Sequence, residues 1–377
     1  MYYDNTGGIM KKLRQSNFEL MRIISMLFVV MWHVILHSDL YNSTGVTKFI
    51  LDALILFGVV HINSFVIVTG YFQCDKEFKW SRFFQTFSIV WFYKALIALI
   101  FFIFITSTIS NVELLKEIMP LDFRDYWYIN CYLILYLLSP FINKLVINLE
   151  QKDFRKLLLL SFVLFSLIPL ISNQGIILND GYTLIQFVFM YLIGAYLKKY
   201  SPDKNIHLKN YSKNKKQVLY LFVLIFVFFV NFMLLIFSKT LIGINSSLLN
   251  EVGTYIFNNS RMYSNPLVII QSISYFLFFS TMSFKSKIVN YISKYTLDVY
   301  LIHESFYISQ NLYKWIGIND FINHKYYVII VIIVTTLIIF ITCIMIGILR
   351  NMLYKLIGKI KIYKKIKYRI KKYITEI

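Results

Sequence analysis

The chain has 377 residues, of which 58% are hydrophobic and only 15% are charged. Soluble globular domains carry about one-quarter charged residues, so this composition excludes a soluble globular protein and indicates an integral membrane protein. The formal net charge of +20 would be typical of a nucleic-acid-binding protein if the basic residues formed one patch, so their positions decide its meaning.

The first segment, MYYDNTGGI, precedes Met10 in MKKLR, which has the character of a bacterial start. We therefore expect residues 1–10 to be a non-native or disordered extension. The first apolar segment is long enough to span a bilayer, and no small-residue cleavage site follows it. It is predicted to remain in the protein as a signal anchor.

Apolar stretches recur along the whole chain. A bilayer core of about 30 Å requires about 20 apolar residues in a helix, and backbone groups in lipid must be hydrogen-bonded within the segment. These runs are too long for barrel strands, so we predict an all-α, polytopic membrane protein with about ten transmembrane helices. The predicted spans are residues 18–38, 49–72, 83–109, 126–146, 157–173, 182–199, 217–237, 264–283, 295–316 and 326–349.

Basic residues are distributed unequally between alternate connections. One set of connections, which includes both ends of the chain, holds 31 of the 39 Lys and Arg residues, and the other set holds 7. Positive charge marks the cytoplasmic side of a membrane protein, so both termini are predicted to be cytoplasmic. Topology thus explains the net charge, and no nucleic-acid partner is expected.

The predicted organisation is a transmembrane domain over residues 11–350 and a basic cytoplasmic tail over residues 351–377. In the tail, apolar residues recur every three to four positions among lysines, as in an amphipathic helix on an anionic membrane surface. The three cysteines lie in or beside apolar segments without close spacing. They predict neither a disulfide framework nor a metal site.

Arg22 and His33 share one face of the first predicted span, NFELMRIISMLFVVMWHVILHS. Eleven residues at about 100° each make three turns plus about 20°, with about 16 Å of helix rise. A basic residue at a cytoplasmic helix end commonly serves topology or snorkels, and an intramembrane histidine can be a packing partner. Because ionisable groups at membrane depth are costly and mark functional sites by default, the pair is a candidate site.

Several motifs in order resemble the acyltransferase family 3 membrane proteins. The hallmark of that family is a basic residue, ten positions and a histidine in the first helix, as in NFELMRIISMLFVVMWH. Later segments are similar to family segments in the same order: NSFVIVTGYF (63–72), FKWSRFF (78–84), DYWYINCYLILYLLSP (125–140) and LDVYLIHE (297–304). The first pattern alone is weak evidence, whereas the ordered set covers most of the chain.

The resemblance implies transfer of an acyl group, usually acetyl from acetyl-CoA, to a hydroxyl of a cell-surface polysaccharide or its lipid-linked precursor. It is closest in character to stand-alone capsule or exopolysaccharide O-acetyltransferases of the bacterial cell membrane. Acetyl-CoA is then the acyl donor and co-substrate, the glycan and membrane lipids are the other partners, and no metal is expected.

The residues suit this chemistry. A neutral imidazole in a water-poor bundle is a reasonable general base for a sugar hydroxyl, so His33 is the predicted catalytic base. Arg22, Lys76, Lys79 and Arg82 gather at the predicted cytoplasmic face, where the phosphates of CoA would meet them. Ordinary positive-inside charge explains the last three equally well.

A second histidine, His303, is predicted to reach a membrane depth similar to that of His33. Glu304 and Asp298 are nearby carboxylates, and either one could orient an imidazole by accepting its second N–H. The alternative for His303 is a packing hydrogen bond within the bundle.

Trp127 and Tyr128 are predicted at an outer interface, where they would belong to an aromatic belt or stack on an acceptor sugar. Lys94 and His61 also lie inside predicted spans, and we interpret both as structural.

Two other classes of protein share parts of this description. A transporter or flippase for a glycan or an acyl donor also has many helices with buried polar groups, but no inverted repeat is visible and few Gly or Pro residues interrupt the spans. A glycan polymerase would be expected to carry a large extracytoplasmic loop. Neither alternative explains the ordered motifs.

Overall fold

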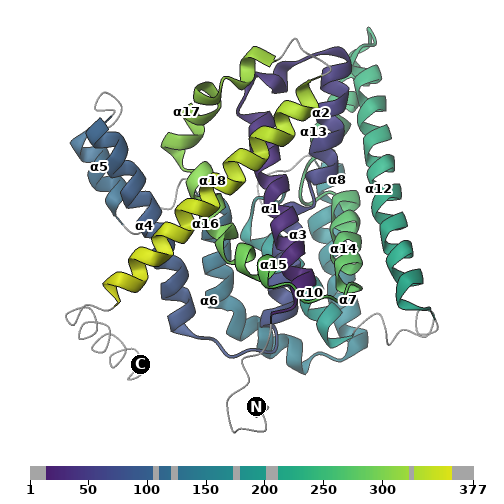
Figure 1. Ribbon diagram of the computed structural model, residues 1–377. Helices are drawn as coiled ribbons and strands as arrows, with labels where there is room; N and C mark the ends of the chain where they lie inside the picture. The colour runs from purple at the N-terminus through teal and green to yellow at the C-terminus, as the bar shows by residue number, and fades with distance from the viewer. Residues whose placement is uncertain are drawn as a thin grey trace.

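The computed structural model describes residues 14–104, 110–119, 126–172, 179–200, 211–321 and 327–358. All regular secondary structure in these residues is helical, as the sequence predicts (Figure 1). The α-helices are α1 Ser16–Leu36, α2 Gly45–Gly58, α3 His61–Gln73, α4 Trp80–Phe104, α5 Asn111–Ile118, α6 Trp127–Asn148, α7 Gln151–Phe162, α8 Pro169–Ser172, α10 Leu184–Lys199, α12 Lys213–Ile242, α13 Ser247–Asn259, α14 Pro266–Ser280, α15 Lys287–Ile292, α16 Thr296–His303, α17 Phe306–Ile316 and α18 Val328–Ile357. Single turns of 3-10 or π-helix are η1 Asp39–Asn42, η2 Val163–Leu167, η3 Asn179–Gly181, η5 Ser293–Tyr295 and η6 Ile318–Phe321.

Six helical segments in the described residues are long and apolar enough to cross a membrane, so the protein is a multi-pass membrane protein. Each coincides with one predicted span, and together they are Ser16–Leu36, Gly45–Gln73, Trp80–Phe104, Trp127–Asn148, Lys213–Ile242 and Val328–Ile357. The other four predicted spans fall on helices that are shorter or interrupted. The count of ten and the cytoplasmic termini remain predictions.

Two of the predicted spans are interrupted for identifiable reasons. In the span 157–173, a π turn, η2, follows α7, and Pro169, which has no N–H to donate to the preceding turn, begins α8. The span 295–316 is divided by Glu304 and Ser305 into α16 and α17. That second break places a carboxylate in the bundle, as described below.

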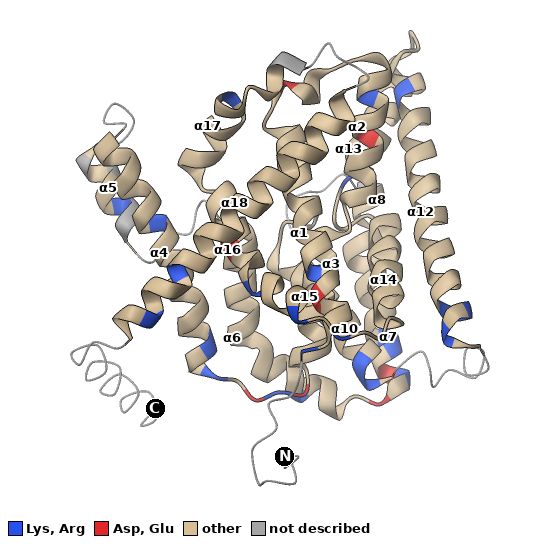
Figure 2. Ribbon diagram, viewed as in Figure 1, with Lys and Arg blue, Asp and Glu red and all other residues tan. Residues whose placement is uncertain are grey.

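Basic residues gather at one end of the bundle (Figure 2). The Lys and Arg segments lie mainly at the lower end of this view, where α7 and α12 begin, and few lie at the upper end. This arrangement is the one expected if the lower end faces the cytoplasm. Residues 1–10, the predicted N-terminal extension, lie outside the described residues. The predicted tail, 351–377, is described to residue 358, and its first seven residues continue α18.

The helix α1 runs through the middle of the bundle and contacts α2, α3, α14, α15, α16 and α18 (Figure 1). Beside it, α3 and α10 pack with their backbones in direct contact. A Cβ atom at Gly70 would overlap the carbonyl of Tyr191, and one at Gly194 would overlap the carbonyl of Ile67. Glycine is therefore required at both positions for these two helices to approach each other.

A buried ion pair joins α16 to α18. Arg350 Nε donates to Asp298 Oδ1 at 2.6 Å, and its Nη2 donates to Oδ2 at 3.3 Å. The hydroxyl of Tyr93 on α4 donates to Asp298 Oδ1 at 2.6 Å. Arg350 and Asp298 are 8% and 1% exposed. This network fixes α16, the helix that carries His303, against two long neighbours.

Candidate functional site

The site is built on α1, which carries both residues of the pair that the sequence singles out. Arg22 lies in the first half of the helix and His33 in its last turn, so the two occupy opposite parts of one face. His33 is partly exposed, with 17% of its side chain accessible. The end of α16 meets α1 beside it.

His303 lies against His33, as their predicted similar depth requires. His33 Nδ1 and His303 Nε2 are hydrogen-bonded at 3.0 Å, and His303 Nδ1 is 2.5 Å from the carbonyl oxygen of Val299. His303 is fully buried. Glu304 Oε2 approaches the same His33 Nδ1 at 2.8 Å.

These contacts fix the position of the proton on His33. A carbonyl only accepts, so His303 Nδ1 must be the N–H that donates to Val299. In the neutral ring His303 Nε2 is then an acceptor, and His33 Nδ1 must donate to it. The neutral His33 ring consequently has its lone pair at Nε2, which is the state that a general base requires.

Glu304 supplies the charge that this base needs. Its Oε2 is buried and makes no hydrogen bond within the described residues. Oε2 is 2.8 Å from His33 Nδ1, but it does not lie along the direction of the N–H bond. A carboxylate in this place stabilises the imidazolium that forms when Nε2 takes a proton. Of the two carboxylates that the sequence offers for this role, Asp298 is held by Arg350 and Tyr93, so Glu304 is the partner of the histidine.

His37, one turn beyond His33, completes the cluster. Its Nε2 is 3.7 Å from Glu304 Oε2, and its ring stacks on Tyr313 with centroids 5.7 Å apart. The ligand atoms of His33, His37 and Glu304 lie within 4.8 Å of one another. His33 Nδ1 and Glu304 Oε2 are 2.8 Å apart. Two ligand atoms held at about 2.0–2.1 Å around a tetrahedral zinc ion are roughly 3.3 Å apart, so this pair is closer together than two zinc ligands would be.

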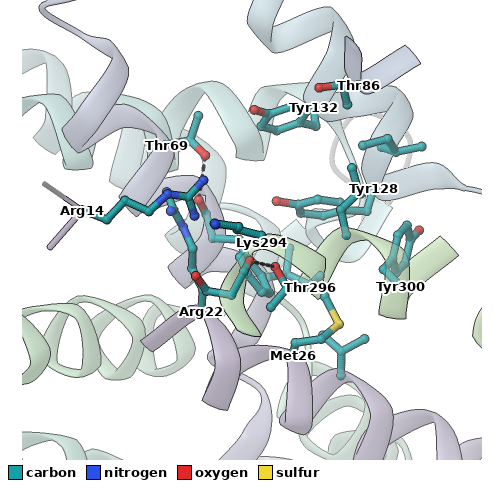
Figure 3. Close-up of a pocket in the computed structure, with 16 residues that line it drawn as sticks. Arg14, Arg22, Met26, Thr69, Thr86, Tyr128, Tyr132, Lys294, Thr296 and Tyr300 are labelled. Carbon is teal, nitrogen blue, oxygen red and sulfur yellow. Dashed lines mark hydrogen bonds between the residues drawn. The ribbon is translucent and has the colours of Figure 1, made fainter. Parts of the chain in front are cut away.

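A cavity of about 320 Å³ is lined along α1 by Arg22, Met26 and Val29 (Figure 3). Val29, one turn before His33, and Tyr300, one turn before His303, both line it. Its lining residues come from the segment just before α1 and from α1, α3, α4, α6, η5 and α16: Arg14, Arg22, Met26, Val29, Ile62, Phe65, Thr69, Thr86, Tyr128, Ile129, Tyr132, Ser293, Lys294, Thr296, Leu297 and Tyr300.

Positive charge is concentrated on one side of this inner cavity. Arg14, Arg22 and Lys294 lie together there, opposite the tyrosines of α6 and α16 (Figure 3). Glu19, which is 6% exposed, accepts from Arg22 at 3.0 Å and from Arg14 at 3.4 Å. Three cations and one carboxylate leave the wall with an excess of positive charge, which suits an anionic ligand.

The other basic residues predicted to bind the donor lie elsewhere. Arg82 lines a neighbouring cavity of about 280 Å³ that shares Thr86 and Tyr132 with the inner cavity. Lys76 and Lys79 are exposed and line neither of these cavities. The structure therefore groups Arg22 with Arg14 and Lys294 rather than with Lys76 and Lys79.

The aromatic pair that the sequence places at an outer interface is divided between two roles. Tyr128 lines the inner cavity. Trp127 packs on Tyr182 and Tyr263, with ring centroids 4.6 Å and 6.1 Å away. His61 lies behind this group, with its ring nitrogens 2.7 Å from the carbonyl of Gly58 and 3.0 Å from the hydroxyl of Tyr263, as its structural interpretation requires.

Sequence reasoning missed three participants at the inner cavity. Arg14 and Lys294 have the character of ordinary positive-inside charges, and only the fold shows that η5 brings Lys294 to α1. The sequence does contain a signal for the contact of Glu19 with Arg22, because their i,i+3 spacing predicts a pair on one helix face.

A family model described as an acyltransferase domain matches residues 15–346. This range includes all the residues of the histidine cluster and all but Arg14 of the inner cavity. Comparison with curated proteins and with solved structures found no match.

Proposed function

Because the chain belongs to the acyltransferase family whose model it matches over residues 15–346, we propose that it transfers an acetyl group from acetyl-CoA to a hydroxyl of a surface polysaccharide or its lipid-linked precursor. Its location would be the bacterial cytoplasmic membrane. The observation that carries this proposal is the contact set of His33, which leaves Nε2 as a base beside the carboxylate of Glu304.

The donor is proposed to bind in the inner cavity. CoA carries several phosphate charges, and Arg14, Arg22 and Lys294 are the cations of that wall. At about 320 Å³ the cavity is at the small end of the range of about 300–1,000 Å³ for ligand sites, so the acyl-bearing arm rather than the nucleotide would enter it. The arm would point along α1 toward His33.

The chemical step would then use His33 and Glu304 in defined roles. His33 Nε2 takes the proton of the acceptor hydroxyl while that oxygen attacks the acyl carbonyl carbon. The carbon–sulfur bond breaks, the CoA thiolate leaves, and the proton on Nε2 passes to the sulfur. Glu304 stabilises the imidazolium between these two proton transfers.

The direct test uses purified protein in liposomes with acetyl-CoA labelled in the acetyl group and de-O-acetylated surface polysaccharide from the source bacterium. We expect label in the polysaccharide that is released by mild alkali, as an ester is. If the label crosses the membrane but remains on CoA or appears as free acetate, the protein is a transporter or a hydrolase instead.

Replacing Arg22 with Ala is expected to raise the KM for acetyl-CoA by roughly 10- to 100-fold, because a hydrogen bond to a charged group contributes about 1.5–3 kcal/mol. The KM for the acceptor should change much less. Arg22→Lys should retain part of the affinity, since the charge remains but the forked geometry is lost. The comparison is Arg155→Ala, which removes an exposed arginine of α7 that bonds Tyr196. Equal KM values for the two alanine variants would exclude Arg22 from donor binding.

A further inference from the structure

A second cavity, the outer cavity, lies where η1, η3 and α13 meet, and its volume is about 1,200 Å³. Tyr41 of η1 lines it, and η1 directly follows the end of α1 that carries His33. The main wall is α13, which connects the end of α12 to the start of α14. The outer cavity is therefore at the histidine end of α1, whereas Arg22 is at the other.

The chemistry of the outer cavity differs from that of the inner one. Amide and hydroxyl side chains predominate, with Asn250 and Thr254 exposed on α13, and Glu251 and Asp180 add two carboxylates. These groups can both donate to and accept from hydroxyls. Tyr255 contributes an aromatic ring that can stack on an apolar sugar face.

The cation on this wall is already engaged. The guanidinium of Arg261 donates to Asp52 at 2.7 Å and to the hydroxyl of Tyr41 at 3.0 Å. Lys48 Nζ is 3.8 Å from the same carboxylate of Asp52, and Lys239 also pairs with it. Asp52 and the two carboxylates of the lining together balance these three cations. Such a site favours an uncharged polyhydroxyl ligand over an anionic one.

Aromatic residues connect the outer cavity to the histidine cluster. Asp180 and Met262 line the cavity, and Tyr182 and Tyr263 follow them closely in the chain with ring centroids 5.0 Å apart. The hydroxyl of Tyr263 is 3.0 Å from Nε2 of His61, and the ring of His61 packs on Trp32, the residue before His33, with ring centroids 5.4 Å apart. These contacts connect the wall of the outer cavity to the part of α1 that carries His33.

We propose that the outer cavity binds the acceptor polysaccharide as a run of uncharged sugar residues, with the reactive hydroxyl directed toward His33. This inference rests on the proposed acyltransferase function and adds the place and the charge class of the acceptor. The volume exceeds the range of about 300–1,000 Å³ for sites that hold one drug-sized molecule, as an oligomeric ligand requires.

Binding can be tested without any acyl transfer. The variant Thr254→Cys places a thiol in the cavity, and Lys314→Cys places one on the exposed surface of α17 as the matched control. De-O-acetylated surface polysaccharide at about ten times its dissociation constant should slow maleimide labelling of position 254 about tenfold and leave position 314 unchanged. Equal labelling of position 254 with and without polysaccharide would overturn the proposal.

Kinetic measurements on two variants separate this proposal from the proposed function. Asn250→Ala and Glu251→Gln should each raise the KM for the polysaccharide roughly 3- to 10-fold, as expected for loss of a hydrogen bond, with the KM for acetyl-CoA unchanged. Unchanged acceptor KM in an active enzyme contradicts the acceptor site alone. Protection of position 254 in a protein that transfers no acetyl group would contradict the function and leave the binding site standing.

Discussion

Replacing His33 with Gln is expected to lower the rate of acetyl transfer by about 10²–10⁴-fold, the usual contribution of a general base. An amide can replace the hydrogen bond that His33 Nδ1 makes to His303, but it cannot accept a proton near neutral pH. The loss should therefore appear in kcat, with the KM for acetyl-CoA nearly unchanged because the cations of the inner cavity are untouched. The measurement is steady-state kinetics on protein shown to be folded by its elution and thermal unfolding.

The matched control is His37→Gln, on the same helix and one turn further along. His37 is 3.7 Å from Glu304 Oε2 and does not contact His303 in the described residues, so its replacement should lower kcat far less. Near-normal transfer by His33→Gln would rule out base catalysis at this position. A hydrogen-bonding role in the bundle would then account for the residue.

Replacing Asp298 with Ala is expected to lower the free energy of unfolding by about 3–5 kcal/mol, the usual result of removing one partner of a buried ion pair. Arg350 would be left with an uncompensated charge in the bundle, where it is 8% exposed. The hydroxyl of Tyr93 would lose its acceptor as well. Thermal unfolding in detergent, followed by the fraction that stays monodisperse on size exclusion, measures the effect.

Asp153→Ala is the control for this stability loss. Asp153 and Lys156 also form an ion pair, at 3.2 Å, but their side chains are 55% and 67% exposed. Exposed pairs contribute about 0–1 kcal/mol, so this variant should unfold close to the unchanged protein. Similar unfolding temperatures for the two variants would show that the buried pair does not stabilise the bundle.

Much of the fold could be predicted because apolar length and secondary structure are tied together in a membrane. α1 and α6 begin and end near the predicted positions, and α18 begins near its predicted position but extends beyond the predicted end, since a run of apolar residues must satisfy its own backbone. The interruption at Glu304 could not be predicted from periodicity, because apolar residues continue on both sides of the short polar stretch 303–305. Pro169 was the visible signal for the interruption in 157–173.

The candidate site was partly predictable for the same reason. The shared face of Arg22 and His33 follows from helix geometry alone. The choice of Glu304 over Asp298 depends on Arg350, which has the character of an end-of-helix topogenic charge in the sequence but is buried in the fold. Grouping Lys294 with Arg22 likewise requires knowing how η5 packs on α1. Arg22 and Lys294 are 272 positions apart, and contacts over such a separation are not recorded in a local pattern.

The glycine contacts between α3 and α10 determine which parts of the protein can move. No side chains separate the two backbones at Gly70 and Gly194. Sliding or rotation of one helix against the other would bring the two backbones into collision, so the helices behave as one rigid body. α3 provides Ile62, Phe65 and Thr69 to the inner cavity, and that wall is therefore fixed. Any widening that admits a long acyl-bearing arm must therefore be a displacement of the other lining elements, α1, α4, α6, η5 and α16, relative to this rigid pair.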